Sequence, residues 1–430
     1  MKKFNLNEVT KRKIIDSIPR TSSQINNLQY DVMEIINNVI LDKDAALVRY
    51  TEEFDGVSIP IEKIKVSKEE IEDSYEKISD DLLDALRYAK KNLLKFHDAQ
   101  IPEDWVIEIE ENVNIGQIYR PIESVGIYIP GGRAIYPSTV LMAAVPAKVT
   151  GVEKIILCSP PQKNGNIAPE ILVAANECEI ANIFKVGGVQ AIAAMAHGTE
   201  SIPNVLKVIG PGNKWVNAAK VLLSNIIAID SPAGPSEILI IADLSAKSSF
   251  VIRDFLSQIE HDPDNIGIIV TPSDDLIEKI ENEIGEYISN SKRKAIIETA
   301  LKNSIIVKTD NLDECVELSN EIGPEHLEIM TENPKELMKH VRNAGAIFLG
   351  SFSPVPLGDY SAGTNHILPT GGNAKVYSGL SVFDFMKSID YLECNKNGLE
   401  ILSKSAMIMA EFEELYEHSN AIKERLNGQK

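Results

Sequence analysis

The chain has 430 residues, of which 44% are hydrophobic and 25% are charged, a composition typical of a folded enzyme of two or three domains. Its formal net charge is -20, so an anionic nucleic acid or membrane surface would be repelled. The basic start MKKFNLNEVTKRK is followed by no apolar stretch, and no run of about 18 apolar residues occurs later. We therefore expect a cytoplasmic protein that binds neither nucleic acid nor membrane.

Residues 25–55 and 68–100 carry apolar side chains at three- and four-residue spacing, the pattern of amphipathic helices. From about residue 105, short β-branched runs alternate with helical segments. Most runs are apolar at successive positions, as parallel strands covered on both faces tend to be. The candidate strands are residues 124–130, 153–159, 181–187, 204–210, 225–230, 237–243, 265–271 and 303–309. This alternation predicts an α/β protein with two doubly wound, Rossmann-like parallel sheets.

The segment IDSPAGPSE, residues 229–237, predicts the crossover between the two sheets. Residues 397–426 return to a helical pattern in a tail too thin to form its own core, so we expect it to pack on another part of the molecule or on another subunit. The predicted parts are an N-terminal helical segment (1–27), a discontinuous first α/β domain (28–127 and 236–380), a second α/β domain (128–235) and a C-terminal helical arm (381–430).

Three glycine-rich turns lie between a predicted strand and a predicted helix, in residues 128–142, 186–198 and 209–220. Free backbone amides at such turns can meet an anion or a cofactor pyrophosphate. None is a G-x-G-x-x-G or P-loop motif, so each alone also fits a plain tight turn. Three glycine-rich turns in one predicted sheet favour a nucleotide or a similar ligand.

The segment GPEHLEIM places Glu325 and His326 side by side after Pro324, which disfavours helix for Gly323. On an irregular turn both side chains can reach one pocket, where a carboxylate could activate water and an imidazole could relay a proton. A surface glutamate beside a half-buried histidine is the alternative. The loop PLGDYSAGTNHILPTGG, residues 356–372, has the composition of functional loops and of simple connections alike.

Gln258 and His261, in SQIEHD, stand three positions apart and share a face if the preceding helix continues, whereas Glu260 points elsewhere. Glu414 and His418 have the spacing of an ordinary surface pair on a helix. Cys158, at the end of a strand pattern, is either a small buried residue or a nucleophile. None of these features alone identifies a site.

Together these segments resemble the histidinol dehydrogenase family, and the resemblance extends over nearly the whole chain from about residue 20. The motifs YIPGGRAIYPSTVLM, GPGNKWV, PAGPSEILIIAD, SQIEHD, GPEHLEI, GDYSAGTNHILPT and SGLSVFDFMK occur in the family's order. The resemblance implies an intertwined homodimer that oxidises L-histidinol to L-histidine with two NAD, in the last steps of histidine biosynthesis.

The resemblance also implies the roles of individual residues. One zinc ion per subunit is expected on Gln258, His261, Asp359 and His418, with the last histidine reaching the metal of the partner subunit. The expected substrate contacts are these four residues together with Ser236, His326 and Glu413. Contacts to NAD are expected from Tyr128, Gln190 and Asn213, all within the glycine-rich turns of residues 128–235.

The implied mechanism uses one site twice. His326 accepts the alcohol proton of L-histidinol while a hydride passes to NAD, which gives L-histidinaldehyde. Glu325 then deprotonates a water that attacks the aldehyde, and the hydrate gives up a second hydride as His326 again accepts a proton. For His366 we expect a bracing role on the loop of Asp359 rather than a contact with the nucleotide.

Three other interpretations remain open. Cys158 could form a thiohemiacetal in a cysteine-dependent aldehyde dehydrogenase. A zinc hydrolase could place Gln258, His261 and Asp359 on the metal with Glu325 as base. A non-catalytic two-domain binding protein could share the fold, although Glu325 and His326 would then be unexplained.

Overall fold

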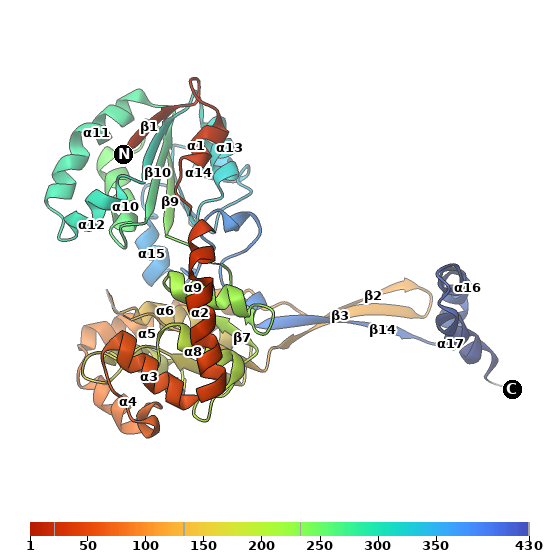
Figure 1. Cartoon of the computed structure of the whole chain (residues 1–430). Helices are drawn as coiled ribbons and strands as arrows, with labels where there is room; N and C mark the ends of the chain where they lie inside the picture. Colours follow the sequence, from red (N-terminus) through yellow and green to blue (C-terminus); the bar gives the residue numbers. More distant parts are fainter. Residues whose placement is uncertain (21, 132–133, 233, 429–430) are drawn as a thin grey trace.

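The structure, a computed structural model, describes residues 1–20, 22–131, 134–232 and 234–428. It contains two α/β lobes and a slender projecting arm (Figure 1). The glycine-rich turn predicted in residues 128–142 includes residues 132 and 133, which lie outside the described residues, as does residue 233 of the predicted crossover. No helix among the described residues combines the length and the apolar composition that a membrane crossing requires.

The first lobe is built on a five-stranded parallel sheet with the order β6-β5-β4-β7-β8. The strands are β4 (Ser124–Tyr128), β5 (Lys154–Cys158), β6 (Asn182–Phe184), β7 (Lys207–Ile209) and β8 (Ala228–Ile229). The crossover helices are α6 (Pro137–Val149), α7 (Pro169–Glu177), α8 (Gly188–His197) and α9 (Lys214–Leu223). All five strands lie within the predicted segments, and β4 occupies the point at which the strand order reverses.

The N-terminal helices cover both faces of this same sheet (Figure 1). They are α2 (Ser22–Asp42), α3 (Asp44–Asp55), α4 (Lys68–Tyr75) and α5 (Asp80–Asp98), with a short 3-10 helix η1 (Ile61–Lys63). Val32 and Ile36 of α2 pack with α8 and α9, whereas Leu86 and Leu93 of α5 pack with α6. The predicted grouping of residues 28–127 with residues 236–380 is therefore wrong, because the apolar faces of these helices are buried against residues 124–229.

The second lobe is a six-stranded parallel sheet with the order β1-β11-β10-β9-β12-β13. The strands are β1 (Lys2–Asn5), β9 (Glu237–Ala242), β10 (Ile266–Thr271), β11 (Ile305–Lys308), β12 (His326–Met330) and β13 (Ala346–Leu349). The helices are α1 (Lys11–Asp16), α10 (Ser248–Ile259), α11 (Asp274–Ser289), α12 (Lys294–Ala300), α13 (Leu312–Ile322), α14 (Pro334–Met338) and α15 (Val355–Tyr360). The N-terminal segment was predicted as helical only, but β1 pairs with β11 at the edge of this sheet.

The two sheets share one topology, although the sequence shows no internal repeat. In the first lobe β4 is central, β5 and β6 extend to one side, and β7 and β8 extend to the other; β9, β10, β11, β12 and β13 follow the same pattern in the second lobe, with β9 central. In the second lobe β1 is added at one edge. The predicted pair of Rossmann-like parallel sheets is confirmed.

The arm is a three-stranded antiparallel ribbon, of order β14-β3-β2, with two helices at its far end (Figure 1). Its elements are β2 (Trp105–Glu110), β3 (Val113–Pro121), β14 (Met386–Cys394), α16 (Lys396–Phe412) and α17 (Tyr416–Asn427), and the 3-10 helices η2 (Asn373–Lys375) and η3 (Val382–Asp384) precede β14. The C-terminal part was predicted as wholly helical, whereas residues 386–394 form a strand. All of β2 is exposed, and Phe412 of α16 is 89% exposed.

Candidate active site

The candidate site lies where the carboxyl edge of the five-stranded sheet meets the amino edge of the six-stranded sheet. Thr139, in the first turn of α6, has its Oγ1 3.1 Å from Nε2 of His366. The neighbouring Asn365 donates from Nδ2 to the carbonyl of Met142, also on α6, at 2.7 Å. Ligands of open α/β sheets usually bind at carboxyl ends of strands. Here only the first lobe follows that rule, because the second lobe places Ser236 at the amino end of β9 and Glu325 and His326 at the amino end of β12.

Glu325 and His326 lie together at the start of β12, as predicted. Gly323 ends α13 in a left-handed conformation with φ 63°, so the chain turns before Pro324. Both side chains are buried, and Glu325 Oε2 lies 3.6 Å from His326 Nδ1. Glu325 Oε2 also accepts a hydrogen bond from the backbone N–H of Glu237 at 2.8 Å. The carboxylate is thereby fixed beside the imidazole.

The contacts of His326 determine which ring nitrogen can act as a base. Nδ1 lies 3.2 Å from the carbonyl oxygen of Glu237, which can only accept, so Nδ1 carries the proton in the neutral ring. Nε2 has no hydrogen-bond partner among the described residues and lies 3.6 Å from Asp359 Oδ1. Nε2 is therefore the atom available to accept a proton from a substrate.

Burial and neighbouring charges shift the pKa values in this cluster. Burial raises the pKa of Glu325 to about 7. Burial lowers the pKa of His326, but the carboxylates of Glu325 and Asp359 outweigh this effect and raise it to about 9. Burial raises the pKa of Asp359, yet His326 outweighs it, so the net shift of that pKa is downward. Two carboxylates thus share one imidazole, and the site has excess negative charge that suits a cation.

Three of the four donors predicted for a metal come from the second lobe. Gln258 lies on the last turn of α10 and is 2% exposed, whereas His261 follows after the helix has ended at Ile259. Nδ1 of His261 lies 3.1 Å from the carbonyl oxygen of Gln258, which leaves Nε2 free. Asp359 lies on α15, and the nearby charge of His261 contributes to the lowering of its pKa.

These three donors fit Zn²⁺, which accepts nitrogen and oxygen ligands without a thiolate. Within one chain these three donors lack the fourth predicted donor, His418. Among the described residues, no group of three or more His, Cys, Asp and Glu side chains is arranged to hold a metal, a count that omits the amide of Gln258. His418, the fourth predicted donor, lies on α17 at the far end of the arm (Figure 1).

His366 braces the loop of Asp359. Its Nδ1 lies 2.9 Å from the carbonyl oxygen of Asp359, and its Nε2 reaches Thr139 of the other lobe. Burial lowers the pKa of His366, so the neutral ring is favoured. The expected bracing contact is present, and it also ties the two lobes together.

The residues predicted to contact NAD lie at the carboxyl edge of the five-stranded sheet. Tyr128 ends β4 and its hydroxyl accepts from the N–H of Gly188 at 3.1 Å. Asn213 caps α9 by accepting from the N–H groups of Trp215 and Val216. Gln190 is completely buried, yet both polar atoms of its side chain lack a partner among the described residues. An unsatisfied buried amide is costly, so a ligand group at this point would stabilise it.

The glycine-rich turn after β7 is held by a buried ion pair that the sequence did not reveal. Lys220 donates to the carbonyl of Gly210 at 3.0 Å and pairs with Asp230, whose Oδ2 accepts from the N–H of Gly210 at 2.9 Å. Gly210 has φ 114°, and a Cβ there would lie 2.1 Å from the carbonyl oxygen of Tyr128. Only glycine allows this close approach.

The remaining predicted residues lie in two places. Ser236 immediately precedes β9, beside Glu237, whose carboxylate pairs with Arg20 at 3.1 Å. Glu413 and His418 line one cleft of about 640 Å³ between α16 and α17. Cys158 is fully buried, and burial raises the pKa of its thiol far above the usual range. A neutral, inaccessible thiol is unsuited to nucleophilic attack, which argues against the cysteine-dependent alternative.

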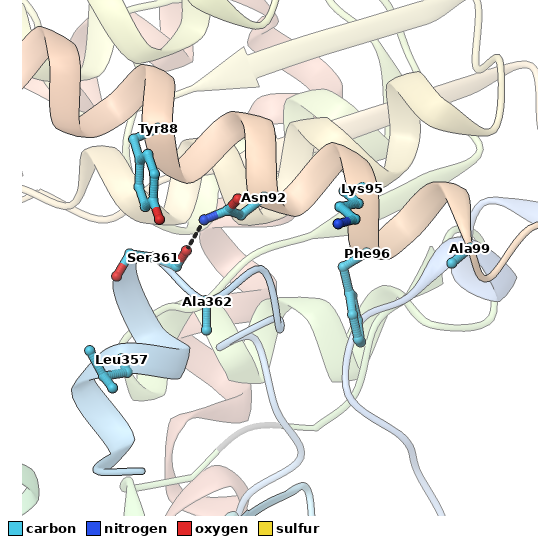
Figure 2. Close-up of a pocket in the computed structure, with 8 residues that line it drawn as sticks. All are labelled: Tyr88, Asn92, Lys95, Phe96, Ala99, Leu357, Ser361 and Ala362. Carbon is cyan, nitrogen blue, oxygen red and sulfur yellow. Dashed lines mark hydrogen bonds between the residues drawn. The ribbon is translucent and has the colours of Figure 1, made fainter. Parts of the chain in front are cut away.

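A cleft of about 680 Å³ adjoins the helix that carries Asp359 (Figure 2). Its wall is formed by α5 on one side and by α15 with the loop that follows it on the other. Asn92 of α5 donates from Nδ2 to the carbonyl of Ser361 at 2.7 Å. The lining residues are Tyr88, Asn92, Lys95, Phe96, Ala99, Leu357, Ser361 and Ala362. The segment of Asp359 therefore borders an open cleft between the lobes.

Fold and site together define a two-lobed α/β protein with a buried Glu–His pair at the junction of its lobes. The family model described as histidinol dehydrogenase matches residues 18–426. A histidinol dehydrogenase of Methanococcus maripaludis is 46% identical over 98% of this chain and 99% of its own length, and that of Caldanaerobacter subterraneus subsp. tengcongensis is 49% identical over 92% and 91%. The crystal structure of histidinol dehydrogenase from Elizabethkingia anophelis superposes with a TM-score of 0.96 at 40% identity, covering 100% of this chain and 98% of that one. The chain belongs to the histidinol dehydrogenase family of NAD-dependent oxidoreductases.

Proposed function

We propose that this protein oxidises L-histidinol to L-histidine through L-histidinaldehyde, with two NAD reduced per substrate, as the last steps of histidine biosynthesis. The observation that carries the proposal is the buried pair Glu325 and His326 beside Asp359, at the junction with the lobe of the glycine-rich turns. A carboxylate and an imidazole in one dry pocket supply the two bases that an alcohol oxidation followed by an aldehyde oxidation requires.

In the first oxidation, His326 Nε2 accepts the proton of the substrate hydroxyl as the hydride leaves the same carbon for NAD. The hydrogen bond from Nδ1 to the carbonyl of Glu237 keeps the ring in the required orientation. The positive charge that develops on His326 is stabilised by Glu325 and Asp359, 3.6 Å away on either side.

In the second oxidation, Glu325 removes a proton from a water that attacks the aldehyde carbon, and the hydrate then loses a hydride to a second NAD while His326 accepts a further proton. A pKa of about 7 suits this role, since the carboxyl group can take and release a proton near neutral pH. His326 must first release its proton for the second cycle.

We propose that Gln258, His261 and Asp359 hold a zinc ion together with His418 of a second subunit. When bound, the metal would orient the nitrogen atoms of the substrate and add positive charge to the site. The Asn265 side chain donates to the backbone carbonyl of Gln258 at 2.8 Å, which fastens the end of α10 to the loop that follows it. Neutralisation of Asp359 by a cation would weaken its pull on His326 and favour the neutral, basic imidazole.

The arm supports a homodimer in which each site is completed by the partner. His418 and Glu413 face one cleft at the end of the arm, and α17 packs on α16. The arm also exposes a set of apolar side chains that a second subunit would cover. They include Trp105, Val106, Ile107, Ile389, Leu392, Ile401, Ile408, Met409 and Phe412. We propose that the partner's arm delivers its metal-binding histidine and its glutamate to the site near Asp359.

We propose that NAD contacts Tyr128, Gln190 and Asn213 in the first lobe. The unpaired amide of Gln190 supplies both a donor and an acceptor, and the side-chain N–H groups of Asn213 remain available because only its oxygen caps α9. We further propose a cytoplasmic location, in keeping with four unpaired cysteines.

The deciding experiment measures NAD reduction with L-histidinol before chelation, after chelation and after zinc is restored. Two NADH per L-histidinol, lost on chelation and regained with zinc, is the expected result. One NADH would contradict the second half-reaction. Absence of histidinol-dependent NADH would exclude the proposal and return attention to a zinc hydrolase or a binding protein.

A further inference from the structure

Two carboxyl groups meet behind the candidate site, where no catalytic role has been assigned. Glu328 lies on β12 two positions after His326, so both side chains project from the same face of the strand. Glu328 is 1% exposed. Its side chain is in hydrogen-bonding contact with Asp254 of α10. The surrounding side chains of β9, α10, β12 and α15 form one apolar cluster.

The two oxygens of Glu328 reach different elements. Oε1 accepts from the backbone N–H of Val355, the first residue of α15, at 3.1 Å. Oε2 receives no N–H or hydroxyl donor from the described residues. The carboxyl group of Glu328 contacts that of Asp254. Because two carboxylates cannot donate to each other, this contact requires one shared proton. Burial raises the pKa of Asp254 to about 6 and raises that of Glu328 well above its usual range, as a shared proton demands.

The pair touches the three elements that carry Gln258, His326 and Asp359. Gln258 stands four positions after Asp254 on α10, and Asp359 stands four positions after Val355 on α15, so each lies one turn further along the same helix face. His326 stands on the strand between them. One carboxyl group thus joins the two helices to the strand.

We propose that Asp254 and Glu328 form a hydrogen-bonded carboxyl pair that positions α10 and α15 against β12 and thereby sets the spacing of Gln258, Asp359 and His326. The expected effect of this pair on activity rests on the proposed function, whereas the contact between Asp254 and Glu328 does not. Both residues are positioning residues, because neither touches the substrate or the cofactor in this arrangement.

The test compares amide and apolar replacements. Glu328→Gln and Asp254→Asn keep a donor and an acceptor in the pair without a shared proton, whereas Glu328→Leu and Asp254→Leu remove the hydrogen bonds at similar volume. Glu332→Gln is the matched control, since Glu332 is exposed just after β12. Each purified dimer is assayed for zinc content, kcat, KM for NAD and melting temperature.

The leucine variants are expected to lose roughly 10- to 100-fold in kcat and to retain less zinc, with KM for NAD unchanged because the cofactor turns belong to the other lobe. The amide variants are expected to stay near the unsubstituted enzyme at neutral pH. Wild-type kcat and zinc content in folded Glu328→Leu would overturn the proposal. So would equal losses in the leucine and amide variants.

The pH dependence of melting gives a readout that is independent of activity. A carboxyl group whose pKa is higher in the folded than in the unfolded protein stabilises the fold at pH values below its unfolded pKa. That stabilisation is lost as the pH rises through its folded pKa. The melting temperature of the unsubstituted protein should therefore fall more between about pH 5 and about pH 8 than that of Glu328→Gln. The charge of His326 also affects the pKa of Glu328. Because His326 is present in the unsubstituted protein and in Glu328→Gln, its own titration contributes to both melting curves. If neither the unsubstituted protein nor any variant oxidises L-histidinol, the proposed function fails. An identical dependence of melting temperature on pH in Glu328→Gln would separately refute the carboxyl pair.

Discussion

Replacement of Glu325 by glutamine separates the two oxidations. Glu325 Oε2 accepts from the N–H of Glu237 at 2.8 Å, a bond that the carboxamide oxygen of glutamine can also accept. The fold of the β12 entry is therefore retained, but the amide cannot take a proton from water. We expect Glu325→Gln to oxidise the alcohol and to fail at the aldehyde.

The size of the effect follows from the role of a general base, which contributes about 10²- to 10⁴-fold to a rate. This corresponds to roughly 3–5 kcal/mol in the barrier of the second oxidation. Stability should not fall. Burial raises the folded pKa of Glu325 to about 7, so any stability from this carboxyl group is lost as pH rises through that value. The neutral glutamine avoids that loss, and the variant should melt no lower than the unsubstituted protein above about pH 7.

The assay supplies either L-histidinol or L-histidinaldehyde with NAD and follows NADH, with a carbonyl reagent to trap released aldehyde. The variant should give close to one NADH per L-histidinol, with aldehyde trapped, and almost none from the aldehyde. In the unsubstituted protein, the rate of aldehyde oxidation should rise with pH through about 7, as Glu325 becomes ionised. Cys158→Ser is the control, because its buried thiol should be dispensable.

Two outcomes would refute this reasoning. Aldehyde oxidation at the normal rate in Glu325→Gln would show that another group activates water. Equal loss of both oxidations, with an unchanged melting temperature, would show that Glu325 orients His326 rather than acting as a base.

Three further tests, with four substitutions, address other parts of the molecule. His418→Ala and Asp359→Ala should each be inactive. After subunit exchange of an equal mixture, about half of the dimers are mixed and each holds one intact site of two, so about one quarter of the activity should return. No recovery in mixed dimers would contradict a shared site. Gly210→Ala should raise KM for NAD or lower the melting temperature, since its Cβ would lie 2.1 Å from the carbonyl oxygen of Tyr128, and normal values for both would show that the turn can relax. Arg20→Ala should lower the free energy of unfolding by about 3–5 kcal/mol, because the fully buried Glu237 loses its ion-pair partner. A decrease of less than about 1 kcal/mol in denaturant unfolding would mean that Glu237 takes up a proton instead.

The sequence was sufficient to predict the strands of both parallel sheets where they are buried on both faces. A short run rich in isoleucine such as EILIIAD, bounded by turn residues, is typical of a strand that is covered on both faces. The ribbon strands were missed for the opposite reason. In β2, WVIEIE alternates, but all six residues are exposed in the single chain, so its pattern marks no core. The four-residue β1, KKFN, is too short and too polar to signal an edge strand.

The assignment of helices to lobes could not be predicted from local pattern. Periodicity shows that Val32, Ile36, Leu86 and Leu93 lie on apolar faces, but it does not indicate which sheet covers them. Both sheets are parallel and are covered by helices on both faces, so either could receive these apolar faces. Only the packed structure decides that residues 28–98 belong with the first lobe.

The site was predictable where its chemistry is local and unpredictable where it depends on distant contacts. Gly323 and Pro324 indicated a turn that would present Glu325 and His326 together, and the two side chains do lie 3.6 Å apart. Asp254 and Glu328 gave no such signal, because an acidic residue on a helix and another in an apolar strand appear unrelated until the elements pack. Their contact is a property of the fold.

The division of labour between the lobes explains why one site can serve both oxidations. The two predicted bases and three of the four predicted metal donors belong to the second lobe, whereas the turns predicted to hold NAD belong to the first. His366 joins the lobes through Asp359 and Thr139, so this contact would keep the predicted metal site of the second lobe aligned with the predicted NAD turns of the first. With both ligands bound as proposed, a spent cofactor would leave the first lobe while the aldehyde stays on the second. Thr139→Val, which keeps the volume but removes the hydroxyl, should therefore increase the aldehyde trapped per L-histidinol, and unchanged trapping would show that the lobes stay in register without this bond.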